Sequence, residues 1–221
     1  MSSLFALTQN QLAIWLDQSV HADCELYNIG GCLDILGDVR YDLMNRALQQ
    51  LIAENDALRL HVCVIDGQPF QTIQKNLQFT LPFHDFSATT DTDDIVEQWL
   101  MQQFQRPFSL EQDAVYWRMA LVRITPTRHA LLTQYHHLIA DGWSTKIVID
   151  RLTELYNALY FERVISPAEH VSYADFVARE ADYARSSAFD RDQAFWDEAL
   201  SRLPEPLFQQ KARRVDALRM P

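Results

Sequence analysis

Two adjacent histidines, followed closely by an acid and a glycine, form the part of this sequence best suited to chemistry. They lie in Tyr135-His-His-Leu-Ile-Ala-Asp-Gly-Trp-Ser144, between a strand-like run and a helix-like run. Side chains alternate faces along a strand, so His136 and His137 should point to opposite sides. An imidazole with an ordinary pKa of about 6.5 can accept a proton at neutral pH. His137, at the end of a strand and beside a glycine-containing turn, is therefore the candidate for acid–base work.

The same alternation argues against a metal site at this segment. His136 and His137 cannot easily share one ion, and a zinc site would also need a third ligand from elsewhere in the chain. The sequence contains no second cluster of such ligands at suitable spacing. We therefore expect no bound metal.

The elements that must position these residues can be predicted from the periodicity of apolar residues. Val115 to Ile124 and His129 to Leu138 are two long strand-like runs joined by a short turn, so we expect an antiparallel pair. A helix should follow from Thr145, and Asp66-Gly67 should form a tight hairpin turn. Further helices are predicted for 12–18, 41–55, 93–105, 173–184 and 191–203, and further strands for 31–36, 58–65 and 70–73. Together these elements predict an α/β chain, a two-layer sandwich of sheet and helices.

Composition excludes several classes of function. The net charge is -11, with 19 Lys plus Arg against 30 Asp plus Glu, so the broad basic surface that nucleic acid requires is missing. No apolar stretch reaches the length of a membrane span, and no signal peptide is recognisable, so we expect a cytoplasmic protein. The three cysteines, Cys24, Cys32 and Cys63, are widely spaced, and we interpret them as small buried hydrophobes.

Several short motifs together resemble one enzyme family. His136-His-Leu-Ile-Ala-Asp-Gly142 is similar to the HHxxxDG signature of condensation domains from nonribosomal peptide synthetases. Other motifs of that family recur in the family's order, in Leu7-Thr-Gln-Asn-Gln11 with Trp15, Asp56-Ala-Leu-Arg59, Tyr173-Ala-Asp175 and Ala194-Phe-Trp196. The second motif departs from the family pattern at Glu54, Asn55 and Leu60.

The resemblance implies a fold and an extent. It covers the N-terminal half of the family's domain, a lobe similar to chloramphenicol acetyltransferase with a mixed, largely antiparallel sheet flanked by helices. We assign 1–205 to this lobe and 206–221 to the start of a linker to a C-terminal lobe that is absent here. In the family the active site lies in a channel between the two lobes.

The resemblance also implies a reaction, partners and residue roles. A donor acyl thioester and an acceptor aminoacyl thioester, each on the phosphopantetheine arm of a carrier protein, would meet near His137 and form an amide. His137 would orient the acceptor amine or take its proton, and the backbone amide of Gly142 would help to stabilise the oxyanion. His136 would support the site, and Asp141 would form a structural ion pair with Arg59. No cofactor would be bound directly.

The position of this lobe at Met1 suggests a donor delivered in trans, as in the initiating modules of siderophore and lipopeptide systems. Two alternatives remain open. One is a coenzyme A-dependent acyltransferase of the same superfamily, which shares HxxxD. The other is a catalytically inert half-domain that serves as a carrier-docking fragment.

Overall fold

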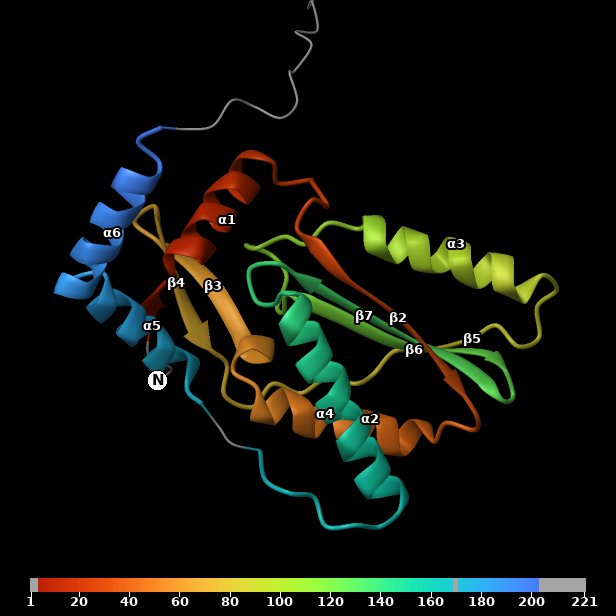
Figure 1. Ribbon diagram of the computed structural model, residues 1–221. Coiled ribbons are helices and arrows are strands. Elements are labelled where there is room, and N and C mark those ends of the chain that lie inside the picture. The colour runs from red at the N-terminus through yellow and green to blue at the C-terminus, as the bar shows by residue number, and fades with distance from the viewer. Residues whose placement is uncertain (1–3, 169–170, 203–221) are drawn as a thin grey trace, which may run out of the picture. The chain divides into compact units, whose positions relative to one another are not determined.

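The computed structural model describes residues 4–168 and 171–202 (Figure 1). The chain divides into two compact units, Met1–Glu180 and Ala181–Pro221. The first unit holds every strand of the described chain, helices α1 to α4 and most of α5 (Tyr173–Tyr183). The second holds the end of α5 and α6 (Ser187–Ala199). The predicted linker, 206–221, lies outside the described residues.

A four-stranded sheet carries the segment with the two histidines. The two long strand-like runs are antiparallel neighbours, as predicted, and a third long strand pairs antiparallel with the second of them and forms one edge of the sheet. A short strand adds parallel at the other edge. In spatial order the strands are β2 (Asn28–Leu36), β7 (Arg128–His136), β6 (Trp117–Thr125) and β5 (Phe83–Asp85).

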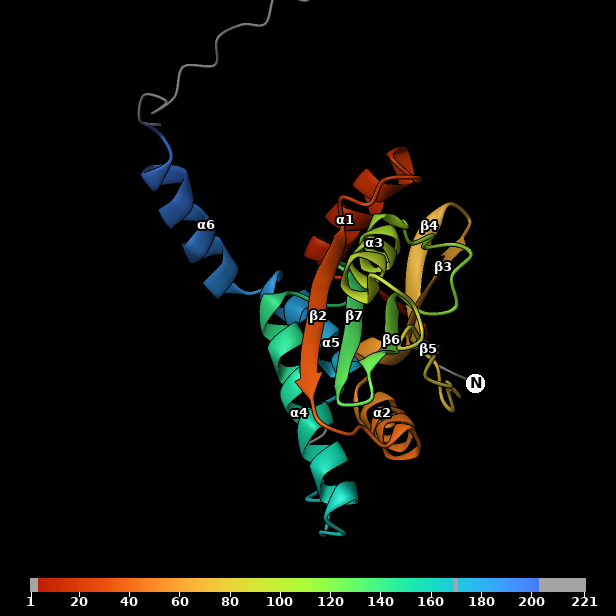
Figure 2. The same ribbon diagram turned by 90° about the vertical axis from the view of Figure 1, so that its right-hand side faces the viewer.

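Helices cover both faces of this sheet (Figure 2). One set of alternating residues in β6 and β7, including Trp117, packs with α2 (Tyr41–Glu54) and α4 (Gly142–Tyr160) into the main core cluster. The other set, including Val122, packs against α3 (Thr92–Gln105). Because successive side chains of a strand face opposite ways, each central strand contributes to both cores. The predicted class, an α/β lobe with a mixed and largely antiparallel sheet flanked by helices, is confirmed.

A second, three-stranded sheet lies in the order β1 (Phe5–Ala6), β4 (Gln68–Ile73) and β3 (Leu60–Ile65). Its two longer strands form the predicted hairpin. At the turn, Asp66 and Gly67 have φ angles of 50° and 76°. Both angles are left-handed, which is the geometry that an Asp-Gly pair favours between antiparallel strands.

Helix α1 (Gln9–Val20) covers a smaller core cluster that joins the two sheets. The helix begins at a capping box, in which the Gln11 backbone N–H donates to the Thr8 hydroxyl and the Thr8 N–H donates to the Gln11 side chain. Its partly buried apolar residues pack against five buried side chains, Leu60, Val62, Leu110, Tyr116 and Leu138. The turn that follows His137 is therefore packed directly beneath α1.

The remaining differences from the predicted elements are short or lie at element ends. Helix α4 begins at Gly142, three residues before the predicted start at Thr145. Strands β1 and β5 were not predicted, and neither was the 3-10 helix η1 (Ala57–Arg59). These three segments have only two or three residues each, too few for a periodic pattern to emerge.

The interpretation of the cysteines as buried is wrong. Cys32 is exposed, and Cys24 and Cys63 are partly exposed. Cys32 lies on β2, which forms the edge of the four-stranded sheet, so the run around it is not covered on both sides. Sequence alone does not distinguish an apolar run in an edge strand from an apolar run in a central strand.

Gly30 marks a close approach between β2 and β7. Its φ is +134°, and a Cβ at this position would lie 2.1 Å from the carbonyl oxygen of Thr133. Only glycine fits there without displacement of one strand. At the neighbouring Gly31 a Cβ would meet nothing within 4 Å.

Candidate active site

His137 is the first residue after β7, and its side chain is exposed. Its backbone N–H donates to the carbonyl oxygen of Tyr27 at 2.8 Å, which holds the strand end against the segment leading into β2. The ring makes no hydrogen bond to any described residue. It lines a hollow of about 510 Å³, together with Asp141, Gln11 and Tyr173. The ring is thus free to bind a ligand in this hollow.

His136 is buried, with 1% of its surface exposed, on the opposite side of the strand from His137, as alternation predicts. Its Nδ1 accepts a hydrogen bond from the Leu138 backbone N–H at 3.0 Å. Nδ1 must therefore carry no proton, and Nε2 donates to the Gln18 side-chain oxygen at 3.4 Å. Burial, with a smaller contribution from His137, lowers the pKa of His136 to about 4. His136 is a neutral residue that orders the strand end and the turn.

Gln18 connects this buried histidine to the end of α1. Its side-chain nitrogen donates to three backbone carbonyl oxygens just beyond the helix, those of His21, Ala22 and Cys24. Because these three groups are acceptors, the side-chain nitrogen of Gln18 must face them, and its side-chain oxygen faces His136. An oxygen can only accept a hydrogen bond, so Nε2 of His136 must carry the proton. The tautomer of His136 is therefore determined at both ring nitrogens.

Gln11 holds the turn on its other side. Its side-chain nitrogen donates to the Leu138 carbonyl oxygen at 3.3 Å and to the Gln71 side-chain oxygen at 3.1 Å. Gln71 in turn donates to the Gln11 side-chain oxygen at 2.8 Å. This buried amide pair joins α1, β4 and the turn after His137. Sequence reasoning identified Gln11 as part of a motif but not as a residue that positions the turn.

Asp141 caps helix α4. One of its carboxylate oxygens accepts from the backbone N–H and the hydroxyl of Ser144, each at 2.7 Å. Both hydrogen bonds lower the pKa of Asp141, and the bond from the Ser144 backbone N–H makes the larger contribution. The carboxylate therefore stays charged at neutral pH and stabilises the first turn of the helix.

The predicted ion pair between Asp141 and Arg59 is wrong: no hydrogen bond or ion pair joins their side chains within the described chain. Arg59 pairs instead with Asp56, with a nitrogen–oxygen distance of 2.7 Å, and also donates to the carbonyl oxygens of Ile52 and Gln74. Asp56 precedes Arg59 by three residues on a helical turn, so the two side chains are neighbours through local geometry. Asp141 is already engaged by the Ser144 hydrogen bonds of its cap.

Asp56 carries this network toward the hollow. Its second carboxylate oxygen accepts from the backbone N–H of Tyr173 at 3.0 Å. Tyr173 lines the hollow beside His137, and burial raises the pKa of its phenol to about 12. This hydrogen bond therefore joins two of the sequence motifs, Asp56-Ala-Leu-Arg59 and Tyr173-Ala-Asp175. Arg59 itself does not line the hollow.

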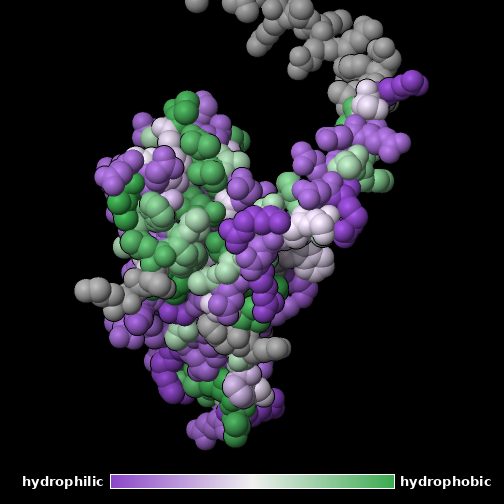
Figure 3. All heavy atoms as spheres, turned by 90° about the vertical axis from the view of Figure 1, so that its left-hand side faces the viewer, coloured by the Kyte–Doolittle hydropathy of each residue, from purple (hydrophilic) through white to green (hydrophobic). Residues whose placement is uncertain are grey.

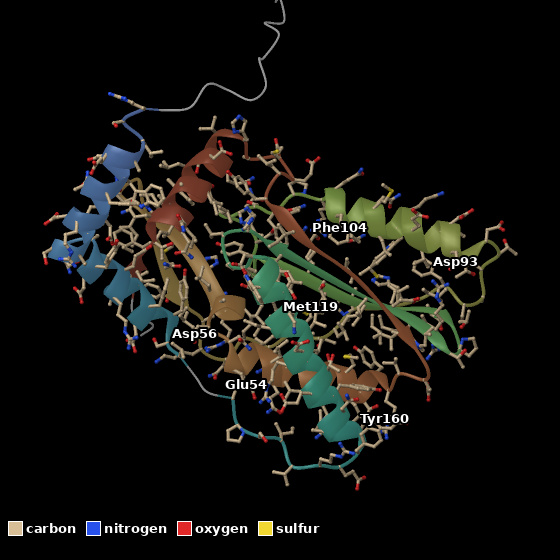
Figure 4. The ribbon with its side chains drawn as sticks, viewed as in Figure 1. Glu54, Asp56, Asp93, Phe104, Met119 and Tyr160 are labelled. Carbon is tan, nitrogen blue, oxygen red and sulfur yellow. The ribbon has the colours of Figure 1, made fainter. Side chains whose placement is uncertain are left out.

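Glu54, a departure from the family pattern, forms a two-point ion pair with Arg151 of α4. The distances are 2.8 and 2.9 Å, and both side chains are mostly buried. Hydrogen bonding to Arg151 lowers the pKa of Glu54. Figure 4 shows Glu54 at the end of α2 beside α4, with Asp56 just beyond it. This pair links the two helices that cover one face of the sheet.

Gly142 is the first residue of α4, where backbone N–H groups have no acceptor within the helix. A Cβ at this position would meet nothing within 4 Å, so the described surroundings do not themselves require glycine. The free N–H and the positive end of the helix are available to an anion or a polarised oxygen approaching from outside.

Neither a metal cluster nor a membrane span is found in the part of the chain that the structure describes. No three His, Cys, Asp or Glu side chains gather there in an arrangement that would hold an ion. None of the described helices combines the length and apolar character needed to cross a bilayer.

The condensation domain family model matches residues 1–219, and the chain belongs to this family. Among curated proteins, it is 29% identical over 170 residues to gramicidin S synthase 2 of Brevibacillus brevis, a match that covers 77% of this chain and 4% of that protein. It is 31% identical over 170 residues to surfactin synthase subunit 2 of Bacillus subtilis (strain 168), which again covers 77% of this chain and 4% of that protein.

The fold matches a solved starter condensation domain, that of rhizomide synthetase. The TM-score is 0.86 at 27% identity, over 93% of this chain and 50% of that one. A mutant of the same domain, solved in complex with C8-CoA and Leu-SNAC, matches with a TM-score of 0.86 and 27% identity over 92% of this chain and 46% of that one. The chain therefore spans about half the length of these solved domains and less than a tenth of the curated relatives.

Proposed function

We propose that this chain is one half of an enzyme that joins a donor acyl thioester to the amine of an acceptor aminoacyl thioester. The observation that carries the proposal is the exposed ring of His137 at a strand end, which has no hydrogen-bond partner among the described residues and lines the same hollow as Asp141. Membership of the condensation domain family supports the same reaction. Both thioesters would be carried by phosphopantetheine arms of partner carrier proteins.

In this proposal the acceptor nitrogen attacks the donor carbonyl carbon, a C–N bond forms, and the C–S bond breaks to release the donor thiol. His137 orients the amine and receives its proton, which then goes to the leaving thiolate. The backbone N–H of Gly142 and the start of α4 stabilise the oxyanion. His136 and Gln11 keep the turn in place, and Asp141 keeps the first turn of α4 formed.

We further propose that the donor opens a peptide chain, as in an initiating module supplied in trans. Similarity to a starter condensation domain that was solved with C8-CoA and Leu-SNAC supports an acyl donor of this kind. The same observation favours a second candidate, in which coenzyme A itself delivers the acyl group. A lipopeptide product fits this donor better than an aryl-acid siderophore does.

The 221 residues alone are proposed to be inactive, because they span half of the solved starter domains. Apolar side chains of the first unit are left uncovered, including Leu16 and Val20 of α1 and Trp143 of α4. Figure 3 shows hydrophobic side chains gathered over one side of this unit. A second lobe packed on such surface would close the hollow and hold both thioesters in attack geometry.

A single-turnover assay tests both parts of the proposal. An aminoacyl carrier protein is mixed with either an acyl carrier protein or acyl-CoA, and amide product is measured by mass spectrometry. The protein encoded by the native reading frame should form amide, and the 221-residue chain should not. Product from the short chain at a comparable rate would show that one lobe suffices. No product from the long protein with any donor would overturn the proposed reaction.

A further inference from the structure

A second hollow, on the α2 side of the first unit, has no part in the site described above. It has a volume of about 620 Å³ and lies between α2 and the segment 75–78 that follows β4. Its polar lining consists of three cations and four amide side chains, Arg46, Gln49, Gln50, Arg59, Lys75, Asn76 and Gln78. We call it the α2 pocket.

The α2 pocket holds uncompensated positive charge on a chain whose net charge is -11. Arg46 and Lys75 are exposed, and the side chain of neither forms an ion pair or hydrogen bond with any described residue. Among the described residues, no carboxylate lines the pocket. Arg59 also lines it, but its charge is offset by Asp56. Two free cations therefore share one concave surface, where a focused positive potential attracts anions.

The wall that carries Lys75 is fixed on both sides by hydrogen bonds. On one side, Arg59 donates to the Gln74 carbonyl oxygen at 2.9 Å, and the Gln74 N–H donates to the Arg59 carbonyl oxygen at 2.8 Å. On the other side, the Gln49 side chain donates to the Leu77 carbonyl oxygen at 2.8 Å and accepts from the Phe79 N–H at 3.0 Å. The spacing between Lys75 and α2 is thus set by the backbone anchors and does not depend on a ligand.

We propose that the α2 pocket binds a phosphate group. Two free cations match the double charge of a phosphate monoester, and a guanidinium such as that of Arg46 suits the geometry of its oxygens. The side-chain amides of Asn76 and Gln78 are exposed and add N–H donors to the lining. The phosphate comes either from free orthophosphate or from an ester such as coenzyme A or phosphopantetheine. This proposal does not involve His137 and does not depend on the proposed reaction.

Titrations followed by amide NMR spectra of the ¹⁵N-labelled 221-residue chain test the proposal. Orthophosphate, coenzyme A and 4′-phosphopantetheine are added in separate series at constant ionic strength, with chloride as the reference anion. Amide signals of segment 75–78 should shift with at least one phosphate-bearing probe. Arg46→Gln and Lys75→Gln should each weaken that binding about tenfold, and Arg46→Lys should weaken it less.

Arg179→Gln is the matched control, because Arg179 is also exposed and forms no ion pair with another described residue, but it lies on α5, outside the pocket. The affinity of Arg179→Gln for the phosphate-bearing probes should stay within about twofold of that of the unsubstituted chain. Much tighter binding of coenzyme A than of orthophosphate would identify an ester as the ligand, and equal binding would identify free phosphate. Either result supports the site. Unshifted signals in segment 75–78 with all three probes, or equal weakening by Arg179→Gln and Arg46→Gln, would overturn it.

Discussion

Mild acid should destabilise this protein through His136. The Leu138 N–H donates to Nδ1 of this buried ring, so protonation would place two donors face to face. Its pKa is about 4 in the folded chain, against an ordinary value of 6.5. Because the folded pKa is the lower one, the stabilisation is complete above pH 6.5 and is lost as the pH falls toward 4. At about 1.4 kcal/mol per pH unit, this amounts to about 3 kcal/mol.

Urea unfolding of the unsubstituted chain and of His136→Asn between pH 7.5 and 4.5 measures this contribution. Asparagine does not titrate, but its side chain can still accept from one group and donate to another. Carboxylates affect both proteins alike, so they cancel in the difference. The advantage of the unsubstituted chain should shrink as the pH falls, by about 1.4 kcal/mol per unit within the window. A difference that does not change with pH would refute a neutral, buried His136.

Three further sets of substitutions test contacts around the site. In a double-mutant cycle, Glu54→Gln and Arg151→Met should couple by about 1–2 kcal/mol in urea unfolding, because both side chains are mostly buried; additive losses would contradict the pair. Gly30→Ala should cost more than about 3 kcal/mol, since its Cβ meets a carbonyl oxygen, whereas Gly31→Ala should cost less than about 1 kcal/mol; equal costs would argue against the close approach. Asp141→Ala should lower the stability of the chain by about 1 kcal/mol in thermal melts, and Asp141→Ser should recover most of this loss. Equal stability of Asp141→Ala and the unsubstituted chain would show that the carboxylate is not a cap.

The features that sequence predicted well depend on neighbours in the chain. Alternation along β7 separates His136 from His137, and the Asp66-Gly67 turn needs only the two residues that form it. Helix α4 follows β7 after a short turn, so the order strand, histidine, turn and helix could be foreseen, whereas the role of Asp141 as a helix cap was not predicted. These elements place His137 in the lining of the hollow.

Tertiary pairing was the part that sequence could not supply. The amide pair of Gln11 and Gln71 joins residues 60 positions apart, and neither residue type signals a partner. Arg59 was assigned to Asp141 by family analogy, whereas Asp56, one helical turn away, takes the ion pair. The spacing of three residues between Asp56 and Arg59 was the local signal for this contact. Strand β5 is too short for a periodic pattern, and its parallel pairing with β6 depends on the path of the chain in space.

The measurement that bears most directly on the proposed function is amide formation by His137→Ala in the protein encoded by the native reading frame. Single-turnover rates with loaded donor and acceptor carriers should fall by about a hundredfold or more. The melting temperature should stay near that of the unsubstituted protein, because the ring is exposed and makes no hydrogen bond to a described residue. His21→Ala, at another exposed histidine, should leave the rate unchanged. Turnover by His137→Ala near that of the unsubstituted protein would contradict the assignment of His137 to the chemical step.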